Sequence, residues 1–283
     1  MDQLSIILQR FSINTDVFFT GNLCGISDFE RKPNQGHIHL LRRGELTIVD
    51  EQGNSQLINE PTVMFFPTPH AHRITGNDDN PPQLVCANII YNETSSNPIA
   101  NALPSLMYFK LTDSQKMNQT ATWLFDEAFD DECGKQPMLN ALTDIFIIHV
   151  LRHVLNNNII NHGLLSGLAH PQISKVMLAI HEAPEHSWGL EEMAGQALMS
   201  RSKFADLFKK VVGQSPGDYV IEWRLTMARR LLLQNRPVAL VANAVGYENG
   251  SALARVFRKK LGMSPKEWLE NKNLSSAIGP SIK

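Results

Sequence analysis

The chain has 283 residues, of which 43% are hydrophobic and 19% are charged, and its formal net charge at pH 7 is −2. This length allows two domains that each bury a core, and the ordinary composition excludes a disordered or fibrous chain. We expect no membrane-spanning segment and no signal peptide, because apolar runs stay short of about 20 residues and an acid follows Met1. The three cysteines are scattered and exclude a disulfide scaffold, so the sequence predicts a cytoplasmic protein.

The near-neutral total charge hides two halves of opposite sign. Residues 167–272 hold 15 Lys and Arg against 10 Asp and Glu, a net charge of +5. Residues 1–166 hold 10 against 18, a net charge of −8. Because clustered cations bind phosphates and release counterions, the C-terminal half is the one expected to contact nucleic acid.

The N-terminal half reads as a β-rich domain. Short β-prone stretches separated by turn signals lie at 17–19, 38–41, 46–49, 57–58, 63–66 and 84–91, a pattern typical of a barrel or sandwich. Helices are expected to follow at 113–129 and 136–156. The second helix is apolar around more than one face, which fits packing against a second subunit as well as full burial within the monomer.

Three histidines of this region, His37, His39 and His72, are weak candidates for metal binding. An alternating pair, an acid at Glu45 and a late histidine are residue types that hold transition metals. However, the spacing from His39 to Glu45 is long and two arginines intervene. Partly buried, hydrogen-bonded histidines explain the pattern better, so we expect no metal, no cofactor and no enzymatic activity.

Polar and glycine-containing residues from 156 to 167 mark a boundary between domains. The sequence therefore predicts an N-terminal domain at 1–160, a linker at 161–170, a C-terminal domain at 171–272 and a tail at 273–283.

The C-terminal domain contains one segment twice, 49 residues apart. Residues 202–210 match residues 251–259, and each copy is followed by Gly and then by Ser-Pro at the same offset. Ser200 and Asn249 are suitable N-caps for the repeated helix, and a short apolar helix precedes each copy. Two short helices joined by a tight turn form a helix-turn-helix. An amphipathic helix at 219–234, with Arg224 and its neighbouring arginines facing outward, would join the two units.

The ordered motifs Ala228-Arg229-Arg230-Leu231-Leu232, Val241-Ala242-Asn243-Ala244-Val245-Gly246-Tyr247, Phe257-Arg258-Lys259 and Gly262-Met263-Ser264-Pro265 resemble the C-terminal signature of AraC/XylS-type transcriptional regulators. The resemblance covers about residues 171–269. It implies a sequence-specific regulator, an activator, whose partners are double-stranded promoter DNA and RNA polymerase. The apolar helix at 136–156 adds a possible homodimer. The alternatives are an architectural DNA binder, a plain helical bundle, an enzyme built on the N-terminal domain, and a regulator whose N-terminal domain binds a metal or small molecule without redox switching.

In that family the recognition helix of each unit enters the major groove of DNA. The positions that match the base-reading residues are Arg201, Ser202, Ala205 and Asp206 in the first unit and Gly250, Ser251, Ala254 and Arg255 in the second. Neighbouring cations complete the predicted DNA-binding surface: Lys203, Lys209, Lys210, Arg258 and Lys259.

The stretch from Gly36 to Gly44, together with Pro67 to His72, is similar to the cupin-type sensor domain of many such regulators. The expected fold class is thus α+β, with a cupin-like β-barrel and flanking helices followed by an all-α domain. The surroundings of Cys24 and Cys86 resemble the cupin_6 subgroup, most closely activators that respond to reactive chlorine species, and this resemblance implies a redox-sensing pair. Free cysteine in an apolar strand also behaves as a small hydrophobe, so a structural role remains open.

Overall fold

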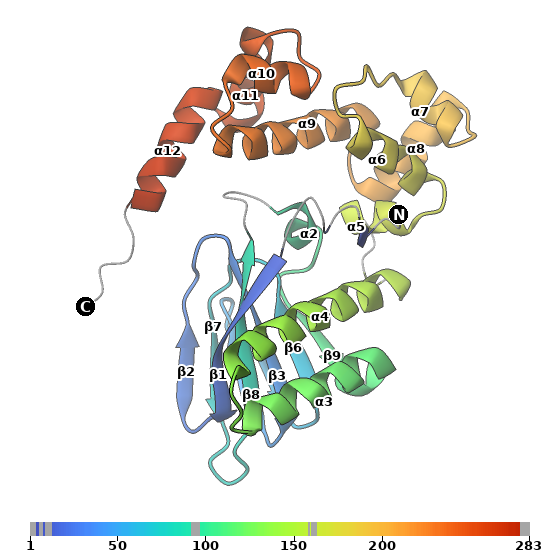
Figure 1. The fold of residues 1–283 in the computed structure, drawn as a ribbon. Helices are drawn as coiled ribbons and strands as arrows, with labels where there is room; N and C mark the ends of the chain where they lie inside the picture. Colours follow the sequence, from blue (N-terminus) through green and yellow to red (C-terminus); the bar gives the residue numbers. More distant parts are fainter. Residues whose placement is uncertain are drawn as a thin grey trace. The chain divides into compact units, whose positions relative to one another are not determined.

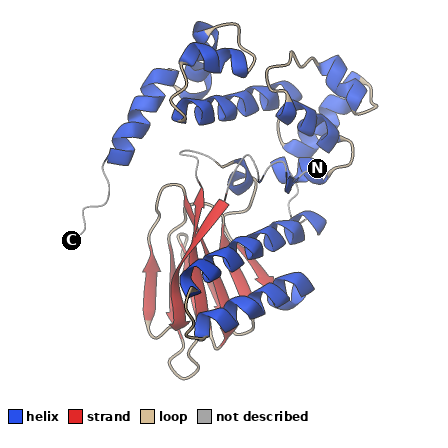
Figure 2. Cartoon of the chain, viewed as in Figure 1, coloured by secondary structure: helices blue, strands red, loops and turns tan. Residues whose placement is uncertain are grey.

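The computed structural model describes residues 4–5, 8, 13–91, 97–157, 159 and 163–277. The chain divides into two compact units, Met1–Asn161 and His162–Lys283, and each is considered by itself below (Figure 1). Strands occur only in the first unit, while the described part of the second is entirely helical (Figure 2). This matches the predicted α+β class.

The first unit contains two antiparallel β-sheets. The larger sheet has the order β1-β8-β3-β6-β9, formed by Ile13–Asn22, Gln83–Tyr91, Gln35–Arg43, Thr62–Phe66 and Met107–Lys110. The smaller sheet has the order β2-β7-β4-β5, formed by Ile26–Phe29, His72–Gly76, Leu46–Asp50 and Ser55–Ile58. The core between them draws Leu41, Met64 and Phe66 from the larger sheet and Ile48 and Ile74 from the smaller one.

Helices cover the outer face of the larger sheet. After the short helices α2 (Pro98–Asn101) and η1 (Leu111–Asp113), α3 (Gln115–Phe129) and α4 (Lys135–Asn156) pack side by side across it (Figure 1). Strand β3 lies between β8 and β6 and is covered on both faces, which explains why its residues from Gly36 to Leu41 are all buried.

Side chains of α4 form hydrogen bonds with β1, an edge strand of the larger sheet. Asp144 accepts hydrogen bonds from the backbone N–H and the hydroxyl of Thr15, each at 2.8 Å, and Asn140 accepts from the N–H of Val17 at 2.9 Å. Burial raises the pKa of Asp144. The helix therefore satisfies backbone donors that would otherwise be open at a sheet edge.

The length and hydropathy of helix α4 contradict the expectation that no segment is long and apolar enough to span a membrane. Its 22 residues have a mean hydropathy of 1.4 over the most apolar window, and it alone among the described helices is long and apolar enough to cross a bilayer. Core helices of globular domains have the same composition. The hydrogen bonds of Asn140 and Asp144 to β1 show that α4 packs against the larger sheet as a helix of the first unit.

The second unit consists of helices that form two similar halves. The first half contains α5 (Leu164–Ala169), α6 (Ile173–Glu182), α7 (Leu190–Gln196) and α8 (Arg201–Val212). The long helix α9 (Pro216–Leu233) leads to the second half, which contains α10 (Val238–Ala244), α11 (Gly250–Leu261) and α12 (Pro265–Ala277) (Figure 1). Gly213 and Gly262 end α8 and α11 in the left-handed conformation, with φ of 85° and 75°.

The expected linker differs from the structure. Residues 164–169 form α5, whose Leu165 and Leu168 are buried and which packs against α6 and α8. Gly167 permits this close approach, because a Cβ there would overlap the sulfur of Met177 and press on Val212. The expected tail also begins inside α12, and residues 161–162 and 278–283 of these predicted segments lie outside the described residues.

Candidate DNA-binding surface and sensor site

The first helix-turn-helix consists of α7 and α8. Phe204 and Phe208 are fully buried at helical spacing on one face of α8, and Met193 and Ala194 of α7 are buried as well. The opposite face of α8 is left to solvent. Ser200 occupies the N-cap position as predicted, but its side chain makes no capping hydrogen bond.

The second helix-turn-helix consists of α10 and α11 and repeats this arrangement. Leu253 and Phe257 of α11 are fully buried, together with Val241 and Ala242 of α10. Here the N-cap is complete, because Asn249 Oδ1 accepts a hydrogen bond from the N–H of Ala252 at 2.9 Å.

The predicted base-reading positions share one face of each recognition helix. Most of the thirteen predicted DNA-binding residues are exposed, and the three with little or no side chain are half-buried. The exposed ones are Arg201, Ser202, Lys203, Asp206, Lys209 and Lys210 on α8, and Ser251, Arg255, Arg258 and Lys259 on α11; Ala205, Gly250 and Ala254 are half-buried. Each helix thus presents a polar, cationic strip opposite its aromatic core face.

Two cations of this unit have partners that the sequence pattern did not indicate. Lys260, at the end of α11, forms an ion pair with Asp218 at the start of α9, with 3.1 Å between Nζ and Oδ1. Arg224 was expected to face outward, but it is half-buried and donates hydrogen bonds to three backbone carbonyls. Periodicity assigns a charged residue to the solvent face and cannot reveal acceptors that lie far away in the sequence.

The two cysteines proposed as a redox pair lie apart. Cys24 is exposed in the segment after β1, whereas Cys86 is only 2% exposed in the core between the sheets, and both are free thiols. On β1, Phe19 pairs with Cys86 and Asn22 with Gln83, and the N–H of Leu23 donates to Pro82 O, so Leu23 lies about 13 Å along the strand from the level of Cys86. Cys24 is the next residue, so its Cα is about 10 Å or more from that of Cys86. A disulfide needs Cα atoms within about 7 Å. Burial also raises the pKa of Cys86, which suppresses the reactive thiolate. The structure therefore corrects the paired-cysteine expectation.

The three candidate metal histidines come together inside the sandwich. His37 and His39 lie on β3 and His72 on β7, with ring centroids 5.0 to 6.0 Å apart and 2.8 Å between Nε2 of His39 and Nε2 of His72. Desolvation lowers the pKa of His37 to about 4, that of His72 to about 3 and that of His39 well below its usual value. All three are neutral at pH 7.

Aromatic side chains pack on both faces of the His72 ring. The His72 ring stacks on Phe66 at 3.9 Å on one side and on Phe29 at 4.7 Å on the other, measured between ring centroids. Glu45 accepts a hydrogen bond from Asn77. Among the described residues, no group of three or more His, Cys, Asp and Glu side chains is arranged to hold a metal ion.

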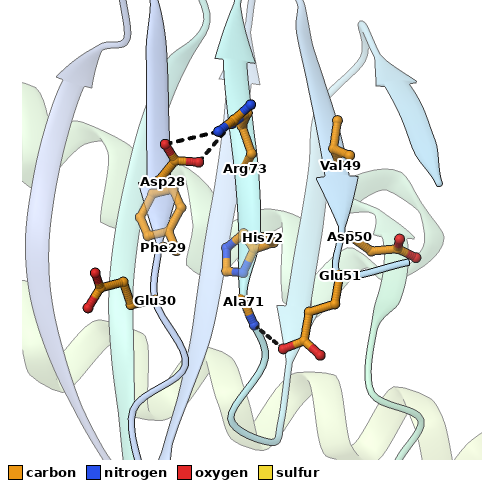
Figure 3. A pocket seen from close by; sticks show the side chains of 9 residues that line it. All are labelled: Asp28, Phe29, Glu30, Val49, Asp50, Glu51, Ala71, His72 and Arg73. Atoms are coloured by element: carbon orange, nitrogen blue, oxygen red, sulfur yellow. Dashed lines mark hydrogen bonds and ion pairs between the residues drawn. The ribbon is translucent and has the colours of Figure 1, made fainter. Parts of the chain in front are cut away.

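A hollow of about 410 Å³ lies on the smaller sheet, over β2, β7 and β4 (Figure 3). Asp28 and Arg73 form an ion pair at its edge, with 2.7 Å between Nε and Oδ1, and this pair lowers the pKa of Asp28. Three further carboxylates line the hollow, belonging to Glu30, Asp50 and Glu51. His72 also contributes to the lining, whereas His37 and His39 do not.

Comparison with known proteins supplies the family. A family model described as Cupin matches residues 2–156, and one described as Helix-turn-helix domain matches residues 193–271. An uncharacterized HTH-type transcriptional regulator of Haemophilus influenzae is 26% identical, with 97% of this chain and 99% of that protein covered. The regulator AlkR of Acinetobacter baylyi is also 26% identical, over 95% of this chain and 99% of its own length. The RCS-specific activator RclR of Escherichia coli is 25% identical, over 82% and 83%.

Among solved structures, the DNA-binding domain of AdpA in complex with a target DNA is 29% identical, with a TM-score of 0.35, and covers 38% of this chain and 96% of that one. The full-length relatives are named as transcriptional regulators and not as enzymes. The chain belongs to the AraC family of helix-turn-helix transcriptional regulators and carries an N-terminal cupin domain.

Proposed function

We propose that this regulator activates transcription by placing both helix-turn-helix units on one promoter site. The observation that carries the proposal is the repeated, exposed polar strip on α8 and α11, each backed by a fully buried aromatic core. A plain helical bundle would have no reason to repeat this strip at the same helical positions.

In this proposal the first unit reads bases through Arg201, Ser202, Ala205 and Asp206. The exposed Arg201 is suited to a guanine, while Asp206 accepts from a cytosine amino group or orients Arg201. The neighbouring cations Lys203, Lys209 and Lys210 contact phosphates.

The second unit offers fewer large side chains to the bases. Gly250, Ser251 and Ala254 are small, so Arg255 is its strongest base contact, and Arg258 and Lys259 bind the backbone. We place α8 and α11 in successive major grooves on one face of the DNA, about 34 Å apart.

The test is selection of binding sites from a random DNA library with the full-length chain, followed by a promoter reporter that carries the selected site. We expect a bipartite site, and we expect expression to fall when Arg201 or Arg255 is replaced by alanine. Recovery of no preferred sequence would overturn the proposal and leave an architectural DNA binder. Deletion of residues 1–160 with retained DNA binding and lost regulation would support control by the cupin unit.

A homodimer and recruitment of RNA polymerase complete the proposal, in the cytoplasm where the promoter lies. The side of α4 that faces away from the sheet exposes 51% of Met138 and 45% of Ile145, with the half-buried Leu142 between them. A second copy would cover this apolar strip. Sedimentation of the full chain tests this directly, since Met138→Gln with Ile145→Gln should shift a dimer to monomer.

Oxidation of a cysteine is a second candidate for the signal that controls the regulator, and in this proposal only Cys24 reacts. Cys24 is exposed and therefore open to an oxidant, and one relative is named as RCS-specific. We expect Cys24→Ser to blunt induction by hypochlorous acid and Cys86→Ser to leave it intact. Full induction in both variants would exclude a thiol response. The cupin unit would then be expected to bind a small molecule, and the hollow beside His72 is where the ligand should be sought.

A further inference from the structure

Arg224 connects the two helix-turn-helix units through three backbone carbonyls. It projects from the middle of α9, and its Nε donates to Pro184 O at 2.7 Å while its Nη2 donates to His186 O at 2.8 Å. Its Nη1 donates to Gly246 O at 3.2 Å. The first two acceptors precede α7, whereas the third lies in the turn between α10 and α11, so a single guanidinium binds both units.

The contact on the first unit continues into its supporting helix. The side chain of His186, whose carbonyl Arg224 binds, pairs with Glu192 of α7, with 2.9 Å between Nε2 and Oε1. Because α7 packs against α8, the position of Arg224 is passed on to the first recognition helix.

The contact on the second unit is equally close. A Cβ at Gly246 would lie 2.6 Å from Nη2 of Arg224 and 2.7 Å from the carbonyl oxygen of Glu185. The turn of the second unit thus lies directly on the segment that leads into the first. The guanidinium also lies 5.4 Å from the ring of Tyr247, within cation–π range.

The chemistry of the site is specific to arginine. A guanidinium has five donors in one plane and stays charged, so it can bind three carbonyls that point inward from different segments. Lysine carries a compact ammonium on a flexible stem and cannot reproduce this planar geometry.

We propose that Arg224 determines the spacing between the two half-sites that the regulator accepts. By joining the segment at 184–186 to the turn at Gly246, it fixes the rotation and separation of α8 and α11. One base pair more or less between the half-sites rotates them by about 35° and moves them by about 3.4 Å. A domain held by Arg224 cannot follow that change, whereas a domain without it can. This inference rests on the proposed function, since it assumes that both units bind DNA.

The experiment measures Kd of the full-length chain for duplexes that carry the selected site with the spacer unchanged or altered by one or two base pairs. Wild type should lose about tenfold in affinity for each base pair. Arg224→Gln should lose less than about threefold over the same series, with weaker binding at the original spacing. Arg230→Gln on the same helix is the matched control and should behave as wild type.

Two further measurements keep the outcomes separate. Thermal unfolding shows whether Arg224→Gln folds, and Arg224→Lys takes its place if it does not. The second measurement is binding to a duplex that carries only the first half-site, where the Kd of the variant should equal that of wild type. Equal discrimination between spacers in wild type and Arg224→Gln, with a uniform loss of affinity, would assign Arg224 to general stability and overturn the inference. Failure of the wild-type chain to select any bipartite site would overturn the proposed function itself.

Discussion

The two helix-turn-helix units share a repeated sequence but differ in the turn between their helices. The recognition helices α8 and α11 start 49 residues apart, at Arg201 and Gly250, whereas the supporting helices α7 and α10 start 48 residues apart, at Leu190 and Val238. The second turn therefore holds one residue more. Its hydrogen bond from Tyr247 N to Ala242 O matches that from Met199 N to Ala194 O, which places the extra residue after Tyr247.

This comparison shows how one backbone shape is reached with different residues. Leu198 and Gly246 occupy the same position in the two turns and have φ of 55° and 80°. Glycine adopts this left-handed conformation without steric cost, whereas leucine does not. Leu198 is also 85% exposed, so it gains little from burial in return. The first turn is locally strained, and the second is relaxed and bound to Arg224.

The largest expected effect tests what the two units share. Phe208 and Phe257 occupy the same repeat position and are both fully buried. Replacing either with alanine should cost about 3–5 kcal/mol of unfolding free energy, because each leaves a cavity in its own half. Urea unfolding of the full-length chain measures this. A small loss for one and a large loss for the other would contradict the equivalence of the two cores.

Arg255→Ala tests the difference between the recognition surfaces. Because Arg255 is the one large side chain among the proposed base-reading residues of α11, its loss should cost about 1–3 kcal/mol of binding and relax selection at one base pair. Titrations against the selected site and its single-base variants measure both effects. Arg258→Ala is the control, expected to weaken binding to all sequences alike. If Arg255→Ala behaves the same way, Arg255 contacts a phosphate.

The N-caps offer a matched pair of substitutions. Asn249 accepts from the N–H of Ala252, whereas the side chain of Ser200 accepts from no N–H of its helix. Asn249→Ala should therefore lower the free energy of unfolding by about 1 kcal/mol, and Ser200→Ala by much less. Equal losses in thermal unfolding would show that the two caps are equivalent in solution.

The smallest expected effect concerns the strained turn. A leucine in the left-handed conformation destabilises the folded state by about 1–2 kcal/mol, and Leu198→Gly removes this strain. The glycine also gives the unfolded chain more conformational freedom, which lowers the free energy of unfolding by about 0.5–1 kcal/mol. We expect a net stabilisation below about 1 kcal/mol. Differential scanning calorimetry should show a slightly higher melting temperature, and a clearly lower one would mean that Leu198 makes a stabilising contact.

Local signals in the sequence were enough to predict the repeated helices. Gly213, Gly262 and Asn249 act on their immediate neighbours, so their roles as helix caps follow from position alone. The extra residue in the second turn was not predicted, because the repeat was aligned on the recognition helices and downstream of them. The starts of the supporting helices reveal it, and the hydrogen bonds of the two turns show where it lies.

Contacts between distant segments account for the features that sequence reasoning missed. The carbonyls bound by Arg224 lie up to 40 residues away, so amphipathic periodicity assigned that side chain to solvent. In the sequence, the glycine at 167 favours a linker, whereas in the structure its lack of a side chain permits the close packing of α5 on Met177. The separation of Cys24 from Cys86 depends on the register of β1 and β8, which composition does not determine.

The central claim is that both units bind the same DNA site, and a hydroxyl-radical footprint of the full-length chain on its selected site tests it most directly. We predict two protected blocks on one face of the DNA, about one helical turn apart, and the loss of protection at one block only in Arg255→Ala. A single compact block that Arg255→Ala leaves unchanged would show that α11 does not enter the DNA and would contradict the account.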